Sequence, residues 1–331
     1  MTSGRLRLAV LIRPTQDAAF AMTPKRFAAA ARRHPDVAAQ LDPVFVADDA
    51  GLDAELGAAE ALLGYRFATA DMARRAPRLR WIQLSGAGAE HLAPFDWLPK
   101  GLALTTASGV HTAKAGEFVT MALLMLNARV PAMATNQRRH AWRQIFTPSI
   151  VGRTVLIVGL GAMGAAAAHA AQRLGLRVSG VRRGARPARF VDRVVGTDGL
   201  DAELPDADFV VLALPVTAAT RGLMDRRRIA LMKPGAGLVN VGRAALLDYA
   251  ALRDALGSQA LSGAILDVFD PEPLPAGSPL WDAPNLTVVP HCSSDDRESY
   301  ADRVLDLTFA NAGRLLAGRP LRNRLSPRRE Y

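Results

Sequence analysis

Short apolar runs and amphipathic segments alternate along the 331-residue chain. The runs are typical of buried parallel strands, because both faces of such strands are covered. They lie at residues 6–12, 80–84, 102–104, 155–158, 176–181, 209–214, 237–241, 263–266 and 286–289. Helical patterns lie at residues 23–33, 112–129, 246–256 and 300–316, and an alanine-rich pattern ends at Leu174. This alternation predicts an α/β fold with doubly wound parallel sheets.

A glycine-rich loop follows the strand predicted at 155–158 and opens the alanine-rich helix. Gly159 permits a tight turn, Gly161 lets a pyrophosphate approach the backbone, and Gly164 allows close packing of helix and strand. The amides of Ala162 and Met163 are then free to face an anion at the helix N-terminus. The alternative is a glycine-rich turn without a ligand, but the position between strand and helix favours a dinucleotide site.

The end of the next strand bears on the choice of dinucleotide. An acidic residue at this position would accept hydrogen bonds from the ribose of NAD. The chain instead has Arg182 and Arg183 there, with no acid nearby. Arginines neutralise a 2′-phosphate, so NADP(H) is the preferred cofactor and NAD(H) a possible one. The alternative is a solvated arginine pair in an arginine-rich protein.

Composition and charge indicate which kinds of partner and which compartment are expected for this protein. The chain has 50% hydrophobic residues, 22% charged residues and a formal net charge of +10. The basic residues are spread along the chain without a zinc-finger spacing, so no nucleic-acid partner is expected. No apolar run approaches the length of a membrane span, so no membrane partner is expected. Cys292 is the single cysteine, which fits a reducing cytoplasm and predicts a cytoplasmic protein.

Seven short segments complement the glycine-rich loop: residues 80–88 (RWIQLSGAG), 214–215 (LP), 220–223 (TRGL), 238–243 (LVNVGR), 266–274 (LDVFDPEPL), 278–281 (SPLW) and 288–291 (VVPH). In this order the chain resembles the D-isomer-specific 2-hydroxyacid dehydrogenase family, and the glyoxylate and hydroxypyruvate reductases within it. The resemblance covers nearly the whole chain. It implies a dinucleotide-binding Rossmann domain at 108–292 and a discontinuous, flavodoxin-like substrate domain formed by 1–107 and 293–331.

The resemblance implies a catalytic triad of Arg243, Glu272 and His291. Arg243 is a permanent planar cation suited to bind the substrate carboxylate and polarise its carbonyl. His291 is a proton donor and acceptor near neutral pH, and Glu272 is expected to orient it. Taken singly, these residues are equally well explained as a surface arginine, an exposed turn and a structural histidine. Their spacing after a nucleotide loop favours the triad.

The remaining site residues also follow from the resemblance. Asp267 matches the position on the carboxamide side of the nicotinamide. Substrate contacts are expected from Arg243, His291 and the loop Ser85, Gly86, Ala87 and Gly88. Further cofactor contacts are expected from Arg243, His291, Leu214, Pro215, Thr220, Val241, Gly242, Ser293 and Ser294. No metal site is expected.

These expectations combine into one function, the reversible NAD(P)H-dependent reduction of a small 2-keto acid to a D-2-hydroxy acid by a homodimer. A nucleotide-sensing, corepressor-like interaction protein is the alternative from another class, and a formate dehydrogenase is disfavoured because that family has glutamine where Glu272 stands. Trp142 is expected to pack in an interface, Lys114 to be solvated at a helix end, and Cys292 to be a small buried residue without a nucleophilic role.

Overall fold

The computed structural model describes residues 4–12 and 18–329. The chain forms two compact units, one comprising residues up to 110 together with those from 296 onward, and the other comprising residues 111–295. The boundaries lie three residues from those drawn on the sequence. The first unit is discontinuous, because its C-terminal part follows the second unit in the chain.

The first unit is built on a five-stranded parallel sheet with the order β2-β1-β3-β4-β5. This 2-1-3-4-5 order is the flavodoxin-like doubly wound arrangement. Its strands are β1 (Leu6–Leu11), β2 (Leu41–Val46), β3 (Ala61–Gly64), β4 (Trp81–Leu84) and β5 (Ala103–Thr105). Its helices are α1 (Pro24–Arg33), α2 (Pro35–Ala38), α3 (Asp49–Leu56), α4 (Met72–Arg75) and α11 (Tyr300–Leu316).

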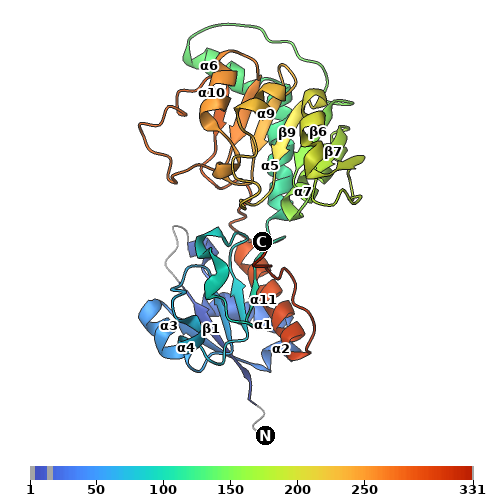
Figure 1. Ribbon diagram of the computed structural model, residues 1–331. Helices are drawn as coiled ribbons and strands as arrows, with labels where there is room; N and C mark the ends of the chain where they lie inside the picture. Colours follow the sequence, from blue (N-terminus) through green and yellow to red (C-terminus); the bar gives the residue numbers. More distant parts are fainter. Residues whose placement is uncertain (1–3, 13–17, 330–331) are drawn as a thin grey trace. The chain divides into compact units, whose positions relative to one another are not determined.

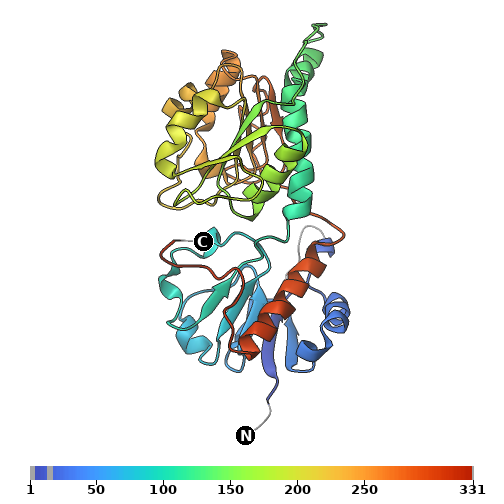
Figure 2. The same ribbon diagram turned by 90° about the vertical axis from the view of Figure 1, so that its right-hand side faces the viewer.

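Successive residues of these strands enter separate cores on the two faces of the sheet. Leu8 and Val10 share one core with residues of α1 and α11, and Ala9 and Leu11 share the other with residues of α3. Figures 1 and 2 show α11 beside α1 on the same face. Both faces are therefore covered, as a parallel sheet requires.

A buried polar network attaches the C-terminal tail to this sheet. Asn311 on α11 donates to the side chain of Gln83 on β4 at 3.0 Å, and its amide also accepts from the backbone of Arg322 at 2.8 Å. Gln83 in turn accepts from Thr105 at 2.9 Å, and all three side chains are fully buried. Because buried polar groups must be hydrogen-bonded, this network specifies where the tail returns.

The second unit contains a seven-stranded parallel sheet with the order β12-β11-β10-β9-β6-β7-β8. This is the Rossmann order with one further strand. The strands are β6 (Thr154–Val158), β7 (Arg177–Val181), β8 (Arg193–Val195), β9 (Phe209–Leu212), β10 (Gly237–Asn240), β11 (Gly263–Leu266) and β12 (Leu286–Val288). The helices are α5 (Thr112–Asn127), α6 (Val130–Arg138), α7 (Ala162–Arg173), α8 (Leu200–Glu203), α9 (Arg226–Leu231) and α10 (Tyr249–Gly257).

The central strands of this sheet again separate two cores. Val155 and Ile157 pack with residues of α5 and α7, whereas Leu156 and Val158 pack with residues of α9 and α10. Helices α5 and α7 lie against each other on one face of the sheet (Figure 2). The predicted α/β class with two doubly wound parallel sheets is confirmed.

Three strands were not predicted. Strand β2 contains Asp42 and Pro43 and lies at a sheet edge, where proline is tolerated. Strand β8 is also an edge strand of three residues, and β3 is too short to distinguish from apolar helix positions. The pairing partners of these segments, which are distant in sequence, make them strands.

Two helix predictions were wrong in their bounds. The helix expected to begin at residue 246 begins at Tyr249, because Asp248 caps it by accepting from the amide of Ala251 at 2.9 Å. The long helix ends at Asn127, and α6 follows after Arg129, whose φ of +60° interrupts the helical path. No single described helix is long and apolar enough to cross a membrane. Helices α5 and α6 reach that length and apolar composition only when taken together, and a bend of 65° separates them.

Candidate active site

The carboxyl edge of the seven-stranded sheet carries most of the predicted site residues. The glycine-rich loop follows β6, Leu214 follows β9, Arg243 follows β10, Asp267 follows β11 and His291 follows β12. The order of the sheet reverses between β6 and β9. In doubly wound folds, ligands bind outside the carboxyl ends of the strands at this switch point.

The glycine-rich loop fits a dinucleotide pyrophosphate. Gly159 has a φ of +98°, and a Cβ on Gly164 would lie 1.8 Å from the carbonyl oxygen of Gly159. Nothing lies within 4 Å of a Cβ placed on Gly161. Gly164 is thus required for α7 to approach the loop, whereas the absent side chain of Gly161 leaves open space beside the amides that begin the helix.

The other expected cofactor residues divide by location. Arg182 and Arg183 directly follow β7, the neighbour of β6, and Arg183 is exposed. Leu214 packs on the loop, since a Cβ on Gly159 would lie 2.7 Å from its Cβ. The Thr220 hydroxyl donates to the Pro215 carbonyl oxygen at 2.8 Å, so this hydroxyl already stabilises the turn between residues 215 and 220. Val241 is buried, beside Gly242.

His291 and Glu272 form a hydrogen-bonded pair. Nδ1 of His291 lies 2.7 Å from Oε2 of Glu272, and the side chains are 49% and 36% exposed. The other oxygen of Glu272 accepts from the amide of Phe269 at 2.8 Å. The backbone therefore fixes the carboxylate, the carboxylate orients the imidazole, and Nε2 is left to face a ligand.

Arg243 begins a short turn after β10. Its backbone oxygen accepts from the buried amide of Asn240 at 3.0 Å, and the Asn240 oxygen accepts from the Gly242 amide at the same distance. The Arg243 guanidinium donates to the Gly242 carbonyl at 2.8 Å. Asn240 thereby holds the turn from which the arginine projects.

Asp267 anchors the segment that follows His291. Its carboxylate accepts from the amides of Cys292 and Ser293, each at 3.0 Å, and from the Ser293 hydroxyl at 2.5 Å. The side chain is buried, and this burial raises the pKa of Asp267 more than the Ser293 hydrogen bonds and nearby His291 lower it.

Cys292 was predicted to be buried, but it is exposed, because Asp267 binds its backbone and leaves the thiol outside. Partial desolvation and the charges of Asp267 and Asp295 nevertheless raise the pKa of the Cys292 thiol, which opposes thiolate formation.

The sequence predicted no chemical role for His111, whose Nδ1 lies 3.3 Å from the Ser294 carbonyl oxygen and 3.5 Å from Oδ1 of Asp295. Burial lowers the pKa of His111, the Asp295 charge opposes this shift, and the charges of Arg243 and His291 add to it. His111 thus lies within electrostatic range of the triad. Its position at the start of α5 gave no sign of this, because its partners are more than 180 residues away.

The predicted substrate loop belongs to the first unit. The Ser85 amide donates to the Gly64 carbonyl at 2.9 Å. No acceptor among residues 4–12 and 18–329 binds the amides of Gly86, Ala87 or Gly88. A Cβ on Gly86 would lie 2.3 Å from the Tyr65 ring. The loop therefore offers up to three amides to a carboxylate, and the Ser85 amide is not one of them.

Within the described parts of the chain, no three His, Cys, Asp or Glu side chains are grouped to hold a metal ion. Lys114 forms an ion pair with Glu117 at 2.9 Å on the exposed side of α5.

Sequence comparison relates the chain to known enzymes. Residues 120–293 match the family model for "D-isomer specific 2-hydroxyacid dehydrogenase, NAD binding domain". The chain is 32% identical over 239 residues to glyoxylate/hydroxypyruvate reductase B of Pectobacterium carotovorum, covering 70% of this chain and 74% of that one. It is 33% identical over 232 residues to D-3-phosphoglycerate dehydrogenase of Mycobacterium tuberculosis, covering 70% of this chain but only 44% of the relative. The chain thus spans less than half of the phosphoglycerate dehydrogenases it matches.

Solved structures agree over nearly the full length. A D-isomer specific 2-hydroxyacid dehydrogenase from Xanthobacter autotrophicus in complex with NADPH and MES superposes with a TM-score of 0.84 at 29% identity, covering 98% of this chain and 99% of that one. An NADPH-dependent glyoxylate/hydroxypyruvate reductase from Sinorhizobium meliloti in complex with NADP and sulfate gives a TM-score of 0.82 at 27% identity, covering 98% and 100%.

Proposed function

Because the chain belongs to the D-isomer specific 2-hydroxyacid dehydrogenase family, we propose that it reduces a small 2-keto acid to a D-2-hydroxy acid with NADPH. The observation that carries this proposal is the His291–Glu272 pair, with its 2.7 Å hydrogen bond, at the same sheet edge as the glycine-rich loop. A structural histidine would not need both an oriented carboxylate and a second ring nitrogen that no described residue binds.

His291 delivers the proton in this scheme. In the imidazolium form both nitrogens donate, Nδ1 to Glu272 and Nε2 to the keto oxygen. The carboxylate stabilises the imidazolium before transfer, and the Phe269 amide keeps the carboxylate in place. In the reverse direction the neutral imidazole accepts the proton from the hydroxyl group.

Arg243 binds the carboxylate of the keto acid and polarises its carbonyl. When bound, the reduced nicotinamide supplies the hydride to C2. The amides of residues 86–88 are suited to hold the substrate carboxylate, and Asp267 holds the segment after His291 and faces the cofactor. Thr220, Val241, Gly242, Ser293 and Ser294 remain expected cofactor contacts.

The preference for NADPH is supported by charge. Arg182 and Arg183 follow β7 where an NAD enzyme carries an acid, and arginines bind a 2′-phosphate. The related structures from Xanthobacter and Sinorhizobium were determined with NADPH and NADP. NADH is expected to serve as a poorer donor.

The names of the relatives suggest glyoxylate and hydroxypyruvate as substrates. We further propose a cytoplasmic homodimer with no nucleic-acid or membrane partner. The dimer is supported by large apolar side chains exposed on and after α5 and α6, among them Trp142 at 94% and Phe146 at 88%.

The test is NADPH oxidation, followed at 340 nm, with glyoxylate, hydroxypyruvate, pyruvate, phenylpyruvate and a branched-chain keto acid. Oxidation that requires both keto acid and NADPH is the expected result. Tight NADPH binding without turnover of any keto acid would favour a nucleotide-sensing protein, and failure of a folded sample to bind either cofactor would reject the dinucleotide site.

A further inference from the structure

A pocket of about 430 Å³ lies within the second unit, at the edge of the sheet opposite to the glycine-rich loop. Its lining includes residues just before four parallel strands: Arg153 before β6, Gly235 before β10, Ser262 before β11 and Asn285 before β12. The proposed reaction uses residues at the carboxyl ends of these strands, so the pocket is separate from the active site.

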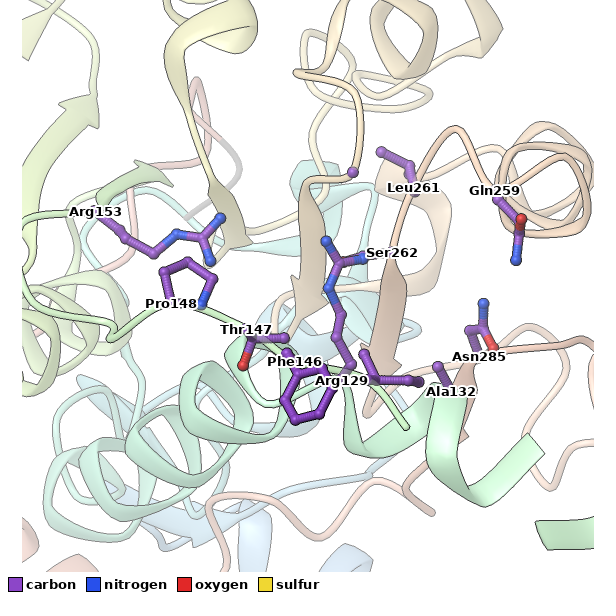
Figure 3. A pocket seen from close by; sticks show the side chains of 12 residues that line it. Arg129, Ala132, Phe146, Thr147, Pro148, Arg153, Gln259, Leu261, Ser262 and Asn285 are labelled. Carbon is purple, nitrogen blue, oxygen red and sulfur yellow. The ribbon is translucent and has the colours of Figure 1, made fainter. Parts of the chain in front are cut away.

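Arg129 extends its guanidinium into this pocket (Figure 3). The guanidinium lies over Gly235, since a Cβ there would be 3.4 Å from Nη2. No acid or acceptor among residues 4–12 and 18–329 pairs with it. Burial and the charge of Arg153 lower the pKa of Arg129, as expected for a partly desolvated cation without a counter-ion.

The surrounding charges leave a positive excess. Arg153 and Lys233 bind the same oxygen of Asp208, at 3.1 and 2.8 Å. One carboxylate therefore serves two cations, and Arg129 adds a third. An anion entering the pocket meets at least one unneutralised cation at short range in a partly buried site, where charge interactions are strong.

Two amide side chains face the same space. Asn285 is 8% exposed, and its side-chain amide has no partner among the described residues, although its backbone amide binds Thr135 at 2.8 Å. Figure 3 shows the amides of Asn285 and Gln259 pointing toward each other across the pocket. The amide of Asn285 is therefore reachable from the pocket, and a ligand with several acceptor oxygens would bind it.

We propose that this pocket is a binding site for a small multivalent oxyanion, held by the guanidinium of Arg129 and the amide of Asn285. The ligand class is a phosphate or a dicarboxylate, since both supply the charge that Arg129 lacks and the acceptors that Asn285 lacks. Arg153 contributes positive potential but keeps its bonds to Asp208 and Asn127.

The test is isothermal titration of the full-length protein with inorganic phosphate or malonate at fixed ionic strength, balanced with chloride. All samples carry Arg182→Ser and Arg183→Ser, so that this second arginine pair cannot contribute. Arg129→Gln is expected to weaken binding at least about tenfold, the loss typical of a charged hydrogen bond. Asn285→Asp places a carboxylate in the pocket and should have a similar effect, and aspartate tolerates the φ of +59° at this position.

Arg177→Gln is the matched control, because Arg177 is an exposed arginine of the same unit outside the pocket. It should leave binding unchanged. Thermal unfolding of each variant distinguishes loss of binding from loss of fold. Binding of phosphate but not malonate, or the reverse, identifies which member of the class fits. The proposal is overturned if neither probe binds, or if Arg129→Gln and Arg177→Gln have equal effects.

Discussion

His291 and Glu272 are brought together by two loops that follow neighbouring strands. Glu272 follows β11 and His291 follows β12, where the histidine has a φ of +49°. Asp267 holds the residues after His291 by their amides. The orientation of the imidazole thus depends on side-chain contacts that no local pattern encodes.

His291→Gln should lower kcat by about 10²–10⁴-fold, because the proton donor is lost while the cofactor loop is untouched. NADPH binding, measured by fluorescence titration, should change little. His140→Gln, at an exposed histidine of the same unit, is the control. Full activity of His291→Gln would mean that another group donates the proton.

The arginine pair after β7 decides the cofactor. Arg182→Ser with Arg183→Ser should raise KM for NADPH by about tenfold or more and leave KM for NADH nearly unchanged, since only NADPH carries the 2′-phosphate. Steady-state kinetics with both cofactors measures this change. Arg186→Ser, four residues beyond Arg182 and exposed, should have no such effect, and an equal loss for both cofactors would contradict the assignment.

Two glycines near the start of helix α7, Gly161 and Gly164, have different structural roles. Gly164→Ala forces a Cβ against the Gly159 carbonyl and should destabilise the fold by about 1–3 kcal/mol. Gly161→Ala meets nothing within 4 Å, so the fold should keep its stability while NADPH binding weakens. Thermal unfolding and cofactor titration of both variants test this contrast. Normal NADPH binding by Gly161→Ala would mean that the pyrophosphate lies elsewhere.

Asp208, just before β9, joins three elements. It accepts from the Thr154 amide at the start of β6, from Arg153, and from Lys233 in the turn before β10. Burial alone would raise the pKa of Asp208, but the Lys233, Thr154 and Arg153 hydrogen bonds lower it from 3.8 to about 2. A carboxyl group whose pKa is lowered by folding stabilises the folded state at pH values above its pKa in the unfolded chain. This contribution is lost as the pH falls from about 4 to about 2.

Asp208→Asn should therefore lower the free energy of unfolding at pH 7 by about 2–3 kcal/mol, because lowering the carboxyl pKa from 3.8 to about 2 corresponds to about 1.4 kcal/mol per pH unit. It should also flatten the loss of stability in acid. Urea unfolding from pH 7 to pH 2 measures both effects. Asp206→Asn, exposed two residues earlier, is the control. An unchanged acid slope in Asp208→Asn would show that the network contributes little.

At the scale of the whole molecule, the exposed apolar side chains predict self-association. Trp142 and Phe146 are 94% and 88% exposed, and Met121, Leu124 and Met133 are more than 40% exposed. Large apolar side chains exposed within a short stretch of the chain favour an interaction surface. Sedimentation velocity should give about twice the chain mass of 35.3 kDa. Trp142→Ser with Phe146→Ser should shift the protein toward monomer, whereas Leu316→Ser, an exposed leucine of the first unit, should not. A monomeric parent protein would reject the dimer.

The α/β class follows from the sequence alone, because buried parallel strands and amphipathic helices have different hydrophobic periods. It also located the glycine-rich loop, since that motif is local and its physical requirements are met within six residues. The family resemblance supplied Arg243, Glu272 and His291 as triad candidates. These predictions depend on residues close together in the chain or on a recognisable order of short segments.

Which side chains lie close together depends on the tertiary structure. Contacts between residues distant in sequence account for the strands β2, β3 and β8, the approach of His111 to Asp295 and the exposure of Cys292. They also place Arg129 in a pocket where no described acid pairs with it. The burial and hydrogen bonding of a side chain depend on these long-range contacts, because its solvation is set by everything packed around it. A single sequence lists the groups, and the packing of two sheets with their helices determines which of them remain available to a ligand.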